Sequence, residues 1–335
     1  MRGGLGVANI LVSTMMGGVS ASNLADAAML SRMMVPEMER KGYNRAFAAA
    51  ITAGGSLVTP IIPPGIALII YGLVADVSIG KMFIAGLVPG LLCAVVLMFT
   101  VYLVARKTNA KPSRESWPTG KEVVFSLGQA WPALFLIFAV VGGIRANIFT
   151  PTEAGAVAVL IVLAIGFFIY REMRISHVVK ALGETARATA SVMLVIMASA
   201  ALGWIFSMEH AGVAVANFVT SLTENKYMFL LIINILLLTL GMFLEGNAIL
   251  LILVPLLKPV VEHFGIDPVH FGIIMIFNLS IGAFTPPVGT VMLLVCNITQ
   301  VSVGNFFKQS LPLLAALLLM LMLVTYIPAI SLFLV

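Results

Sequence analysis

The chain has 335 residues, of which 61% are hydrophobic and only 10% are charged, and its formal net charge is +5. A soluble domain carries about 25% charged and roughly 45–50% apolar residues, so this composition excludes an ordinary soluble fold and predicts an all-α polytopic membrane protein. The basic residues fall in short loops between long apolar runs, where they set the orientation of membrane spans and do not indicate nucleic-acid binding.

The first predicted element covers residues 4–29, which are only moderately apolar and hold a cluster of glycine, serine, asparagine and aspartate. Such a segment is a poor lipid-facing span, so we predict a re-entrant hairpin whose polar tip is shielded by other helices. Residues 30–45 carry Arg32, Arg40, Lys41 and Arg45 and are predicted to form a cytoplasmic loop.

An interrupted span follows over residues 46–73, and its middle reads Thr59-Pro60-Ile61-Ile62-Pro63-Pro64-Gly65. Three prolines and a glycine cannot all continue a helix, because each proline lacks a backbone donor and clashes with the preceding turn. In hydrocarbon, broken backbone is tolerated only where protein buries it or where it lines a watery cavity. Residues 81–105 form an uninterrupted span and complete a first repeat, assigned to residues 1–105.

Residues 106–226 are predicted to be connecting or scaffold helices. We expect spans over residues 123–143, 155–170 and 188–206, and the order Thr150-Pro151-Thr152-Glu153 predicts a helix start. The basic stretch 171–187 is expected to form a cytoplasmic loop or a surface helix.

A second repeat is assigned to residues 227–335. The apolar run 227–261 is too long for one span of about 30 Å and too short for two, and Glu245-Gly246-Asn247 lies in its middle. We therefore predict a second re-entrant hairpin with arms 227–243 and 248–261. Residues 271–296 form a second interrupted span, broken at Thr285-Pro286-Pro287-Val288-Gly289, and residues 307–332 form a full span.

The loop over residues 262–270 contains no Lys or Arg and is predicted to lie outside the cell. His263, Asp267 and His270 have a spacing that suggests a metal trio only weakly, and we interpret them as residues of a solvated loop.

The two repeats can be aligned by eye. Val35-Pro36 corresponds to Val254-Pro255, and Val77-Ser78-Ile79-Gly80 corresponds to Val301-Ser302-Val303-Gly304, with a double proline between them in each repeat. The alternation of basic loops makes the first interrupted span run outward and the second inward, so the repeat is predicted to be inverted. Two interrupted spans in corresponding halves indicate a secondary transporter with its sites near the midplane.

The most specific motifs of the chain are Ser20-Ala21-Ser22-Asn23-Leu24-Ala25-Asp26-Ala27-Ala28, Ala46-Phe47-Ala48-Ala49-Ala50-Ile51-Thr52-Ala53, Pro60-Ile61-Ile62-Pro63-Pro64, Asp267-Pro268-Val269-His270-Phe271-Gly272 and Thr285-Pro286-Pro287-Val288-Gly289. Together they resemble the large membrane subunit of TRAP transporters, the DctM-like permeases, over essentially the whole chain. That subunit begins some helices earlier, so the first scaffold helices are expected to be absent here. Its second hairpin tip usually has an aspartate followed by a hydroxyl residue, where this chain has Glu245-Gly246-Asn247.

The resemblance implies a sodium-driven importer of organic acids, of the C4-dicarboxylate or sugar-acid type, in the bacterial inner membrane. It implies no enzymatic activity and no cofactor other than sodium as the coupling ion. The expected partners are a periplasmic solute-binding protein and a small four-helix membrane subunit. The resemblance also implies an elevator mechanism, in which the hairpins and interrupted spans move as one body against a static scaffold.

Sodium prefers oxygen ligands, which carbonyls of unwound helix and side-chain hydroxyls supply. We predict one sodium site at the first tip and break and a mirror site at the second, formed by Ser20, Ser22, Asp26, Ser56, Thr59 and Pro60 and by Glu245, Asn247, Gly282, Thr285 and Pro286. The substrate is expected to meet N–H groups of the tips, since helix N-termini carry partial positive charge. Its predicted side-chain and backbone contacts are Asn23, Asn247, Gly65 and Gly289.

The residues leave two alternatives open. Asp26 is equally suited to cap a helix at the hairpin turn. Asp26 and Glu245 could also act as proton relays, which would make the protein a proton-coupled organic-anion carrier of the same architecture.

Overall fold

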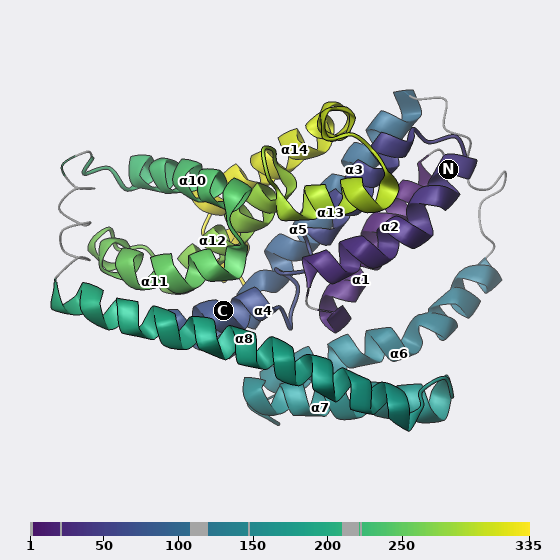
Figure 1. Ribbon diagram of the computed structural model, residues 1–335, viewed down its shortest axis with the longest axis horizontal. Coiled ribbons are helices and arrows are strands. Elements are labelled where there is room, and N and C mark those ends of the chain that lie inside the picture. The colour runs from purple at the N-terminus through teal and green to yellow at the C-terminus, as the bar shows by residue number, and fades with distance from the viewer. Residues whose placement is uncertain (1–2, 21, 108–119, 147, 210–220, 222) are drawn as a thin grey trace.

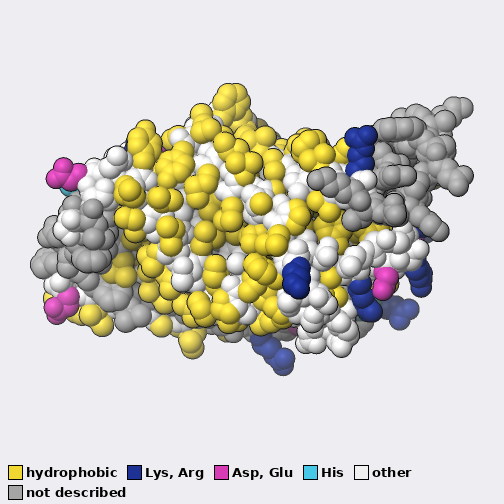
Figure 2. Space-filling view, turned by 90° about the horizontal axis from the view of Figure 1, so that it is seen from above, with side chains coloured by type: hydrophobic (Ala, Val, Ile, Leu, Met, Phe, Trp, Pro, Cys, Tyr) yellow, Lys and Arg dark blue, Asp and Glu magenta, His cyan; other side chains and the backbone are white. Residues whose placement is uncertain are grey.

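The computed structural model describes the chain apart from residues 1–2, 21, 108–119, 147, 210–220 and 222, and every regular element in this described part is helical (Figure 1). Within it, four helices are long and apolar enough to cross a membrane: α5 (Ile79–Lys107), α10 (Lys226–Phe243), α11 (Gly246–His263) and α14 (Val303–Tyr326). Figure 2 shows apolar side chains over most of the middle of one face, whereas most charged side chains lie near its ends. The predicted all-α membrane fold is confirmed.

The first hairpin consists of α1 (Gly4–Ser20) and α2 (Asn23–Arg40), which turn at the predicted tip. The prediction of a loop over residues 30–45 is wrong for most of its length, because α2 continues through it to Arg40. Polar residues there mark one face of an amphipathic helix: Val35 and Met38 are buried, whereas Glu37 and Arg40 form an exposed ion pair of 3.5 Å.

Both interrupted helices break where the prolines predict. The first consists of α3 (Arg45–Ser56) and α4 (Ile66–Ala75), and the second of α12 (Pro268–Phe284) and α13 (Thr290–Thr299). Helices α3 and α12 are buried almost all round, and residues 57–63 of the first break are buried as well. The Pro63–Pro64 and Pro286–Pro287 peptide bonds are cis. Protein therefore shields the first break from lipid, as broken backbone in a membrane requires.

The predicted break at the second tip is confirmed, since α10 ends at Phe243 and α11 begins at Gly246. Both helices are long enough to cross a membrane, so the re-entrant course of this hairpin stays a prediction. The prediction that His270 lies in a solvated loop is wrong. Asp267 caps α12, so His270 falls in the first helical turn, where it is buried. Its Nδ1 lies 2.7 Å from the Ser331 hydroxyl oxygen, and its Nε2 lies 3.3 Å from the Thr325 carbonyl oxygen.

The connecting region holds α6 (Gly120–Arg145), α7 (Pro151–Ala164), the π-helical turn η1 (Ile165–Ile169) and α8 (Ile175–Met208), and α15 (Ala329–Leu332) ends the chain. The helix start at Thr150 is confirmed by a reciprocal cap: the Thr150 N–H donates to Glu153 Oε2 (2.7 Å), and the Glu153 N–H donates to Thr150 Oγ1 (3.3 Å). The basic stretch is mostly helix rather than loop, and α8 runs from it into the predicted span without interruption.

The two hairpins and the two interrupted helices pack reciprocally. Helix α1 packs on α3, and α10 packs on α12, so each hairpin contacts the first half of its own interrupted helix. The second halves are exchanged, because α4 packs against α11 and α13 packs against α2 (Figure 1). Helix α6 contacts α1, and α8 contacts α11. This arrangement brings both tips and both breaks to the middle of the molecule.

Candidate functional site

The first hairpin tip starts α2 with neutral polar groups. The Ser22 hydroxyl oxygen accepts a hydrogen bond from the Ala25 N–H at 3.4 Å, and the Asn23 side-chain oxygen accepts one from the Leu24 N–H at 2.9 Å. Serine and asparagine are favoured at such starts because their oxygens satisfy N–H groups that have no partner within the helix. The cap itself therefore adds no charge to the N-terminus of α2, whose first turn carries its acidic residue at Asp26.

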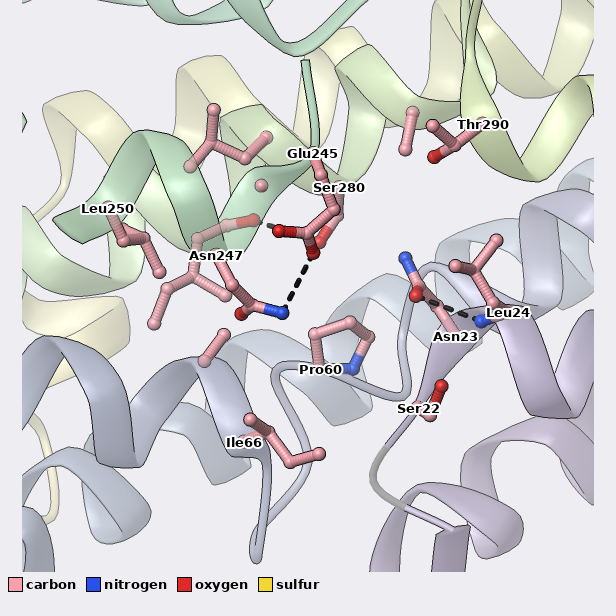
Figure 3. Close-up of a pocket in the computed structure, with 15 residues that line it drawn as sticks. Ser22, Asn23, Leu24, Pro60, Ile66, Glu245, Asn247, Leu250, Ser280 and Thr290 are labelled. Carbon is pink, nitrogen blue, oxygen red and sulfur yellow. Dashed lines mark hydrogen bonds between the residues drawn. The ribbon is translucent and has the colours of Figure 1, made fainter. Parts of the chain in front are cut away.

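The second tip starts α11 with an acidic group. The Glu245 carboxylate accepts from the Ala248 N–H through Oε2 at 3.0 Å and from the Asn247 side-chain amide through Oε1 at 2.8 Å. The carboxylate stays exposed toward the cavity between the tips (Figure 3). Because an anion is stabilised at a helix N-terminus, Glu245 already compensates the charge of this one.

The two tips and the two interrupted helices line one cavity of about 130 Å³ (Figure 3). Its described lining is Ser22, Asn23, Leu24, Pro60, Ile66, Ala67, Glu245, Gly246, Asn247, Leu250, Ile276, Leu279, Ser280, Ala283 and Thr290. The structure thus brings together the predicted residues Ser22, Asn23, Pro60, Glu245 and Asn247 from distant parts of the chain. Apolar walls with a few converging polar groups are typical of a small-molecule site.

Asp26 lies behind the first tip and does not line the cavity. Its side chain is 1% exposed, and its Oδ2 accepts from the Thr59 hydroxyl at 3.3 Å. Ser13 faces the same carboxylate, yet neither its hydroxyl nor Asp26 Oδ1 has a hydrogen bond of good geometry to a described residue. The ion pairs of the described residues do not include Asp26 either. A buried carboxylate without a cationic partner is costly, which makes this cluster a candidate cation or proton site.

Other predicted site residues lie near the cavity but outside its wall. Ser56 and Thr285 donate to carbonyls of their own helices, at 2.8 Å to Ala53 and 2.7 Å to Ile281. Gly289 donates its N–H to the Met242 carbonyl at 2.9 Å. The space beside Gly65 is filled by the Pro60 carbonyl, which a Cβ at this position would contact. The Ser20 side chain lies outside the described part of the chain.

Gly282 and Pro286 belong to the second break without lining the cavity. Gly282 packs on the backbone of Gly241 in α10, which fixes the break against its own hairpin. Pro286 is half-buried in the break itself. Thr285, the residue before it, ends α12 by donating its backbone N–H to the Gly282 carbonyl at 3.0 Å.

Sequence reasoning missed three polar residues at the site. Ser280 and Thr290 flank the second break and line the cavity, as their positions next to the double proline could have indicated. Ser13 lies within an apolar helix, more than a turn before the tip, and the packing of α1 against α2 brings it to Asp26.

Comparison with known proteins agrees with this geometry. The family model described as "Tripartite ATP-independent periplasmic transporter, DctM component" matches residues 1–330. The chain belongs to this family. It is therefore a permease subunit of a transporter in the bacterial inner membrane and not an enzyme.

Three relatives illustrate the family. The chain is 39% identical to the C4-dicarboxylate TRAP transporter large permease protein DctM of Pseudomonas aeruginosa, over 99% of this chain and 77% of the relative. It is 39% identical to the sialic acid TRAP transporter large permease protein SiaM of Vibrio cholerae, over 100% and 78%. It is 37% identical to the isethionate TRAP transporter permease protein DctMQ of Oleidesulfovibrio alaskensis, over 99% of this chain and 52% of that longer relative.

Proposed function

We propose that this subunit imports an organic acid through the cavity between the two hairpin tips, driven by a sodium gradient. The observation that carries the proposal is the convergence of both tips and both breaks on one cavity. The buried carboxylate of Asp26 lies behind the first tip and has no ion-pair partner among the described residues. Such convergence of broken helices is where secondary transporters hold substrate and coupling ions.

A sodium ion fits best beside Asp26. Three oxygen-bearing side chains from three elements meet there, those of Ser13, Asp26 and Thr59, and two of their oxygens lack a hydrogen bond to the described residues. A cation would satisfy these oxygens and neutralise the carboxylate. The predicted ligands Ser56 and Pro60 lie close to Thr59 in the sequence. Their oxygens complete the proposed set of sodium ligands.

A second sodium site, at Glu245, Asn247, Gly282, Thr285 and Pro286, stays a prediction. In the structure Glu245 caps α11 and lines the cavity, whereas Gly282, Thr285 and Pro286 do not line it. Ion binding at this second site would require one of two things. Either the Glu245 carboxylate releases the N-terminus of α11, or the backbone carbonyls of the second break bind the ion without Glu245.

We also propose that the fold is an inverted repeat that works as an elevator. The reciprocal packing of α4 on α11 and of α13 on α2 is what two halves related by a pseudo-two-fold axis would produce, and it supports repeats over residues 1–105 and 227–335. The hairpins and interrupted helices would move together because they pack on one another, and α6–α8, within residues 106–226, would belong to the static scaffold.

The partners follow from the family. Its description is tripartite and periplasmic, so we propose a periplasmic solute-binding protein and a small four-helix membrane subunit as the other two components. The relatives named for a C4-dicarboxylate, sialic acid and isethionate have similar identities to this chain, so the proposed substrate class is an organic acid without further assignment from them.

Proton coupling is the second candidate, because a buried Asp26 that has no cationic partner in the described part of the chain is also neutralised by a proton. Sodium coupling and proton coupling can be distinguished by reconstituting the complete transporter in vesicles and imposing either a sodium gradient or a proton gradient. We expect uptake that follows an inward sodium gradient at equal pH on both sides. Uptake that ignores sodium and follows a proton gradient would overturn the sodium proposal in favour of the proton-coupled carrier.

A further inference from the structure

A second cavity lies in the connecting region, between α6 and the end of α7, two helices that pack against each other (Figure 1). It is an open groove of about 270 Å³. Its described lining is Pro132, Leu136, Val162, Ile165, Gly166, Tyr170 and Met173, in which the only side-chain oxygen or nitrogen is the Tyr170 hydroxyl. Such a groove accepts a hydrocarbon chain, whereas an organic acid or a sodium ion finds no partner for its charge there.

The mouth of this groove, formed by Tyr170 and Met173, falls at the membrane surface. Helix α7 and the π-helical turn η1 run consecutively from Pro151 to Ile169, which is roughly 28 Å of helix at 1.5 Å per residue. This length is close to the hydrocarbon thickness of about 30 Å, so the chain leaves the hydrocarbon region at Tyr170. A half-exposed tyrosine at this position is typical of the membrane–water interface.

The residues at the mouth are mostly basic. Arg171 and Arg174 are both exposed, and Glu172 between them offsets only part of their charge. Helix α8 begins directly afterwards at Ile175 and has no acidic residue in its first turn. The first N–H groups of a helix have no partner within it and carry partial positive charge, so the start of α8 adds to the attraction for an anion.

The π-helical turn joins the apolar groove to this basic mouth. The Tyr170 N–H donates to the Ile165 carbonyl at 3.0 Å, and the Met173 N–H donates to the Gly166 carbonyl at 3.4 Å, so the chain folds back on itself. Met173 lies so close to Gly166 that a Cβ there would be 2.7 Å from the Met173 side chain. Single π-helical turns occur frequently at functional sites. Residues 165–174 therefore present an apolar surface and two arginines side by side.

We propose that this groove binds one acyl chain of an anionic phospholipid from the bilayer, with the lipid phosphate at Arg171, Arg174 and the N-terminus of α8. An apolar groove that ends in a basic mouth at the cytoplasmic surface matches an amphiphile with a negatively charged head. The bound lipid packs against α6 and α7 together and stabilises their contact. This site is separate from the cavity between the hairpin tips.

The test titrates the purified full chain in detergent with dioleoyl phosphatidylglycerol or dioleoyl phosphatidylcholine and counts bound lipids by native mass spectrometry. We expect phosphatidylglycerol to bind about tenfold more tightly, because the two lipids share their acyl chains and differ in net charge. It should also raise the melting temperature more than phosphatidylcholine does. Glycerol 1-phosphate, an anionic headgroup without acyl chains, should leave the melting temperature unchanged.

Two substitutions in α7 test the groove. Val162 lines it and is 37% exposed, so V162W fills the groove without entering the core, and it should weaken the binding of both lipids about tenfold. V159W is the matched control, because Val159 is an exposed valine of the same helix outside the groove lining, and it should leave both affinities unchanged.

Substitutions in the basic segment test the mouth. The double variant R171Q/R174Q should bring the two lipids to within about twofold of each other and leave phosphatidylcholine binding as it was. K180Q is its control, since Lys180 lies further along α8 and pairs with Glu184 at 4.0 Å. Retention of the preference in K180Q distinguishes a site at the mouth from diffuse attraction by the whole basic segment.

Three results would overturn the inference. The first is equal binding of both lipids by the unmodified chain, and the second is the same lipid affinity in V162W and V159W. The third is retention of phosphatidylglycerol by the chain alone but not by the complete transporter, because the small membrane subunit then covers the groove in place of a lipid.

Discussion

The first hairpin tip starts its second helix with Ser22 and keeps its acid, Asp26, buried one turn further on, whereas the second tip uses its acid, Glu245, as the cap itself. The surrounding packing is much more alike. Helices α1 and α10 each lie along a buried helix that is followed by a break with a double proline, and each contributes a buried asparagine to the contact. The same helices therefore pack together in the two halves, while the polar groups at the two tips differ.

The largest expected effect lies at the first tip. In D26N the neutral amide keeps the bond to Thr59 and removes the charge that a coupling cation requires. Sodium-driven uptake in reconstituted vesicles should fall by about a hundredfold, equivalent to roughly 3 kcal/mol of cation binding free energy. The melting temperature should stay close to that of the unmodified chain, because burying a neutral amide costs less than burying a charge.

D76N is the control for this experiment. Asp76 is exposed, and asparagine tolerates its left-handed backbone conformation (φ 60°), so neither uptake nor stability should change. If D26N takes up substrate with sodium at the unmodified rate, the charge of Asp26 is not needed to bind the coupling cation.

A second comparison concerns the closest approach between each hairpin and its break. A Cβ at Gly282 would lie 2.6 Å from the backbone of Gly241, whereas a Cβ at Gly17 would lie 3.0 Å from the Ile62 side chain and 3.2 Å from the Thr59 Cα. We expect G282A to destabilise the protein by about 1–3 kcal/mol, because its Cβ would overlap backbone, and G17A to cost less, because its contacts are longer. Thermal unfolding of the purified chain measures both.

G304A is the matched control, because nothing lies within 4 Å of a Cβ at this helical position. Its stability should be unchanged or raised by about 0.5–1 kcal/mol, the helix preference of alanine over glycine. Equal losses in G282A and G17A would mean that the two breaks are held with the same tightness.

Two buried amide pairs offer a finer comparison of the halves. The Asn9 side-chain amide donates to the Thr52 hydroxyl at 2.6 Å between α1 and α3, and the Asn278 side-chain amide donates to the side-chain oxygen of Asn234 at 2.6 Å between α12 and α10. T52V and N278L should each cost about 1–3 kcal/mol of unfolding free energy, because each leaves a buried amide without its partner.

Double-mutant cycles separate these bonds from packing changes. N9L with T52V, and N234L with N278L, should each recover part of the loss, because replacing both partners by apolar groups removes the unsatisfied atom. If the changes in unfolding free energy are strictly additive in one of the two cycles, the asparagine in that half does not stabilise the packing of the hairpin on the interrupted helix.

Much of this fold follows from short-range signals in the sequence. Prolines 286 and 287 cannot continue a helix wherever they lie, and Glu245-Gly246-Asn247 interrupts an apolar run at its middle, so both breaks and the second hairpin were predictable. Amphipathic helices were harder, because the charged face of α2 gives residues 30–40 the composition of a loop.

Long-range partners could not be predicted at all. His270 contacts Ser331 and Thr325 of the C-terminal helices, and Ser13 faces Asp26 because of the way α1 packs against α2. Local sequence contains no information on such pairs. For the candidate site, the elements that form the cavity were predicted, whereas the direction in which each acid points is a result of packing.

The smallest expected effect tests whether the caps themselves distinguish the tips. The Ser22 cap is long, at 3.4 Å, so S22A should lower the unfolding free energy by only about 0.5–1 kcal/mol. S22D makes the first tip resemble the second, and its carboxylate should stabilise the N-terminus of α2 by about 0.3–1 kcal/mol. The same charge should weaken binding of an organic acid such as 4-hydroxybutyrate, measured by its shift in melting temperature. A stabilised S22D protein that still binds the acid with unchanged affinity would place the substrate carboxylate elsewhere than at the first tip, because a helix N-terminus already compensated by its own cap attracts no second anion.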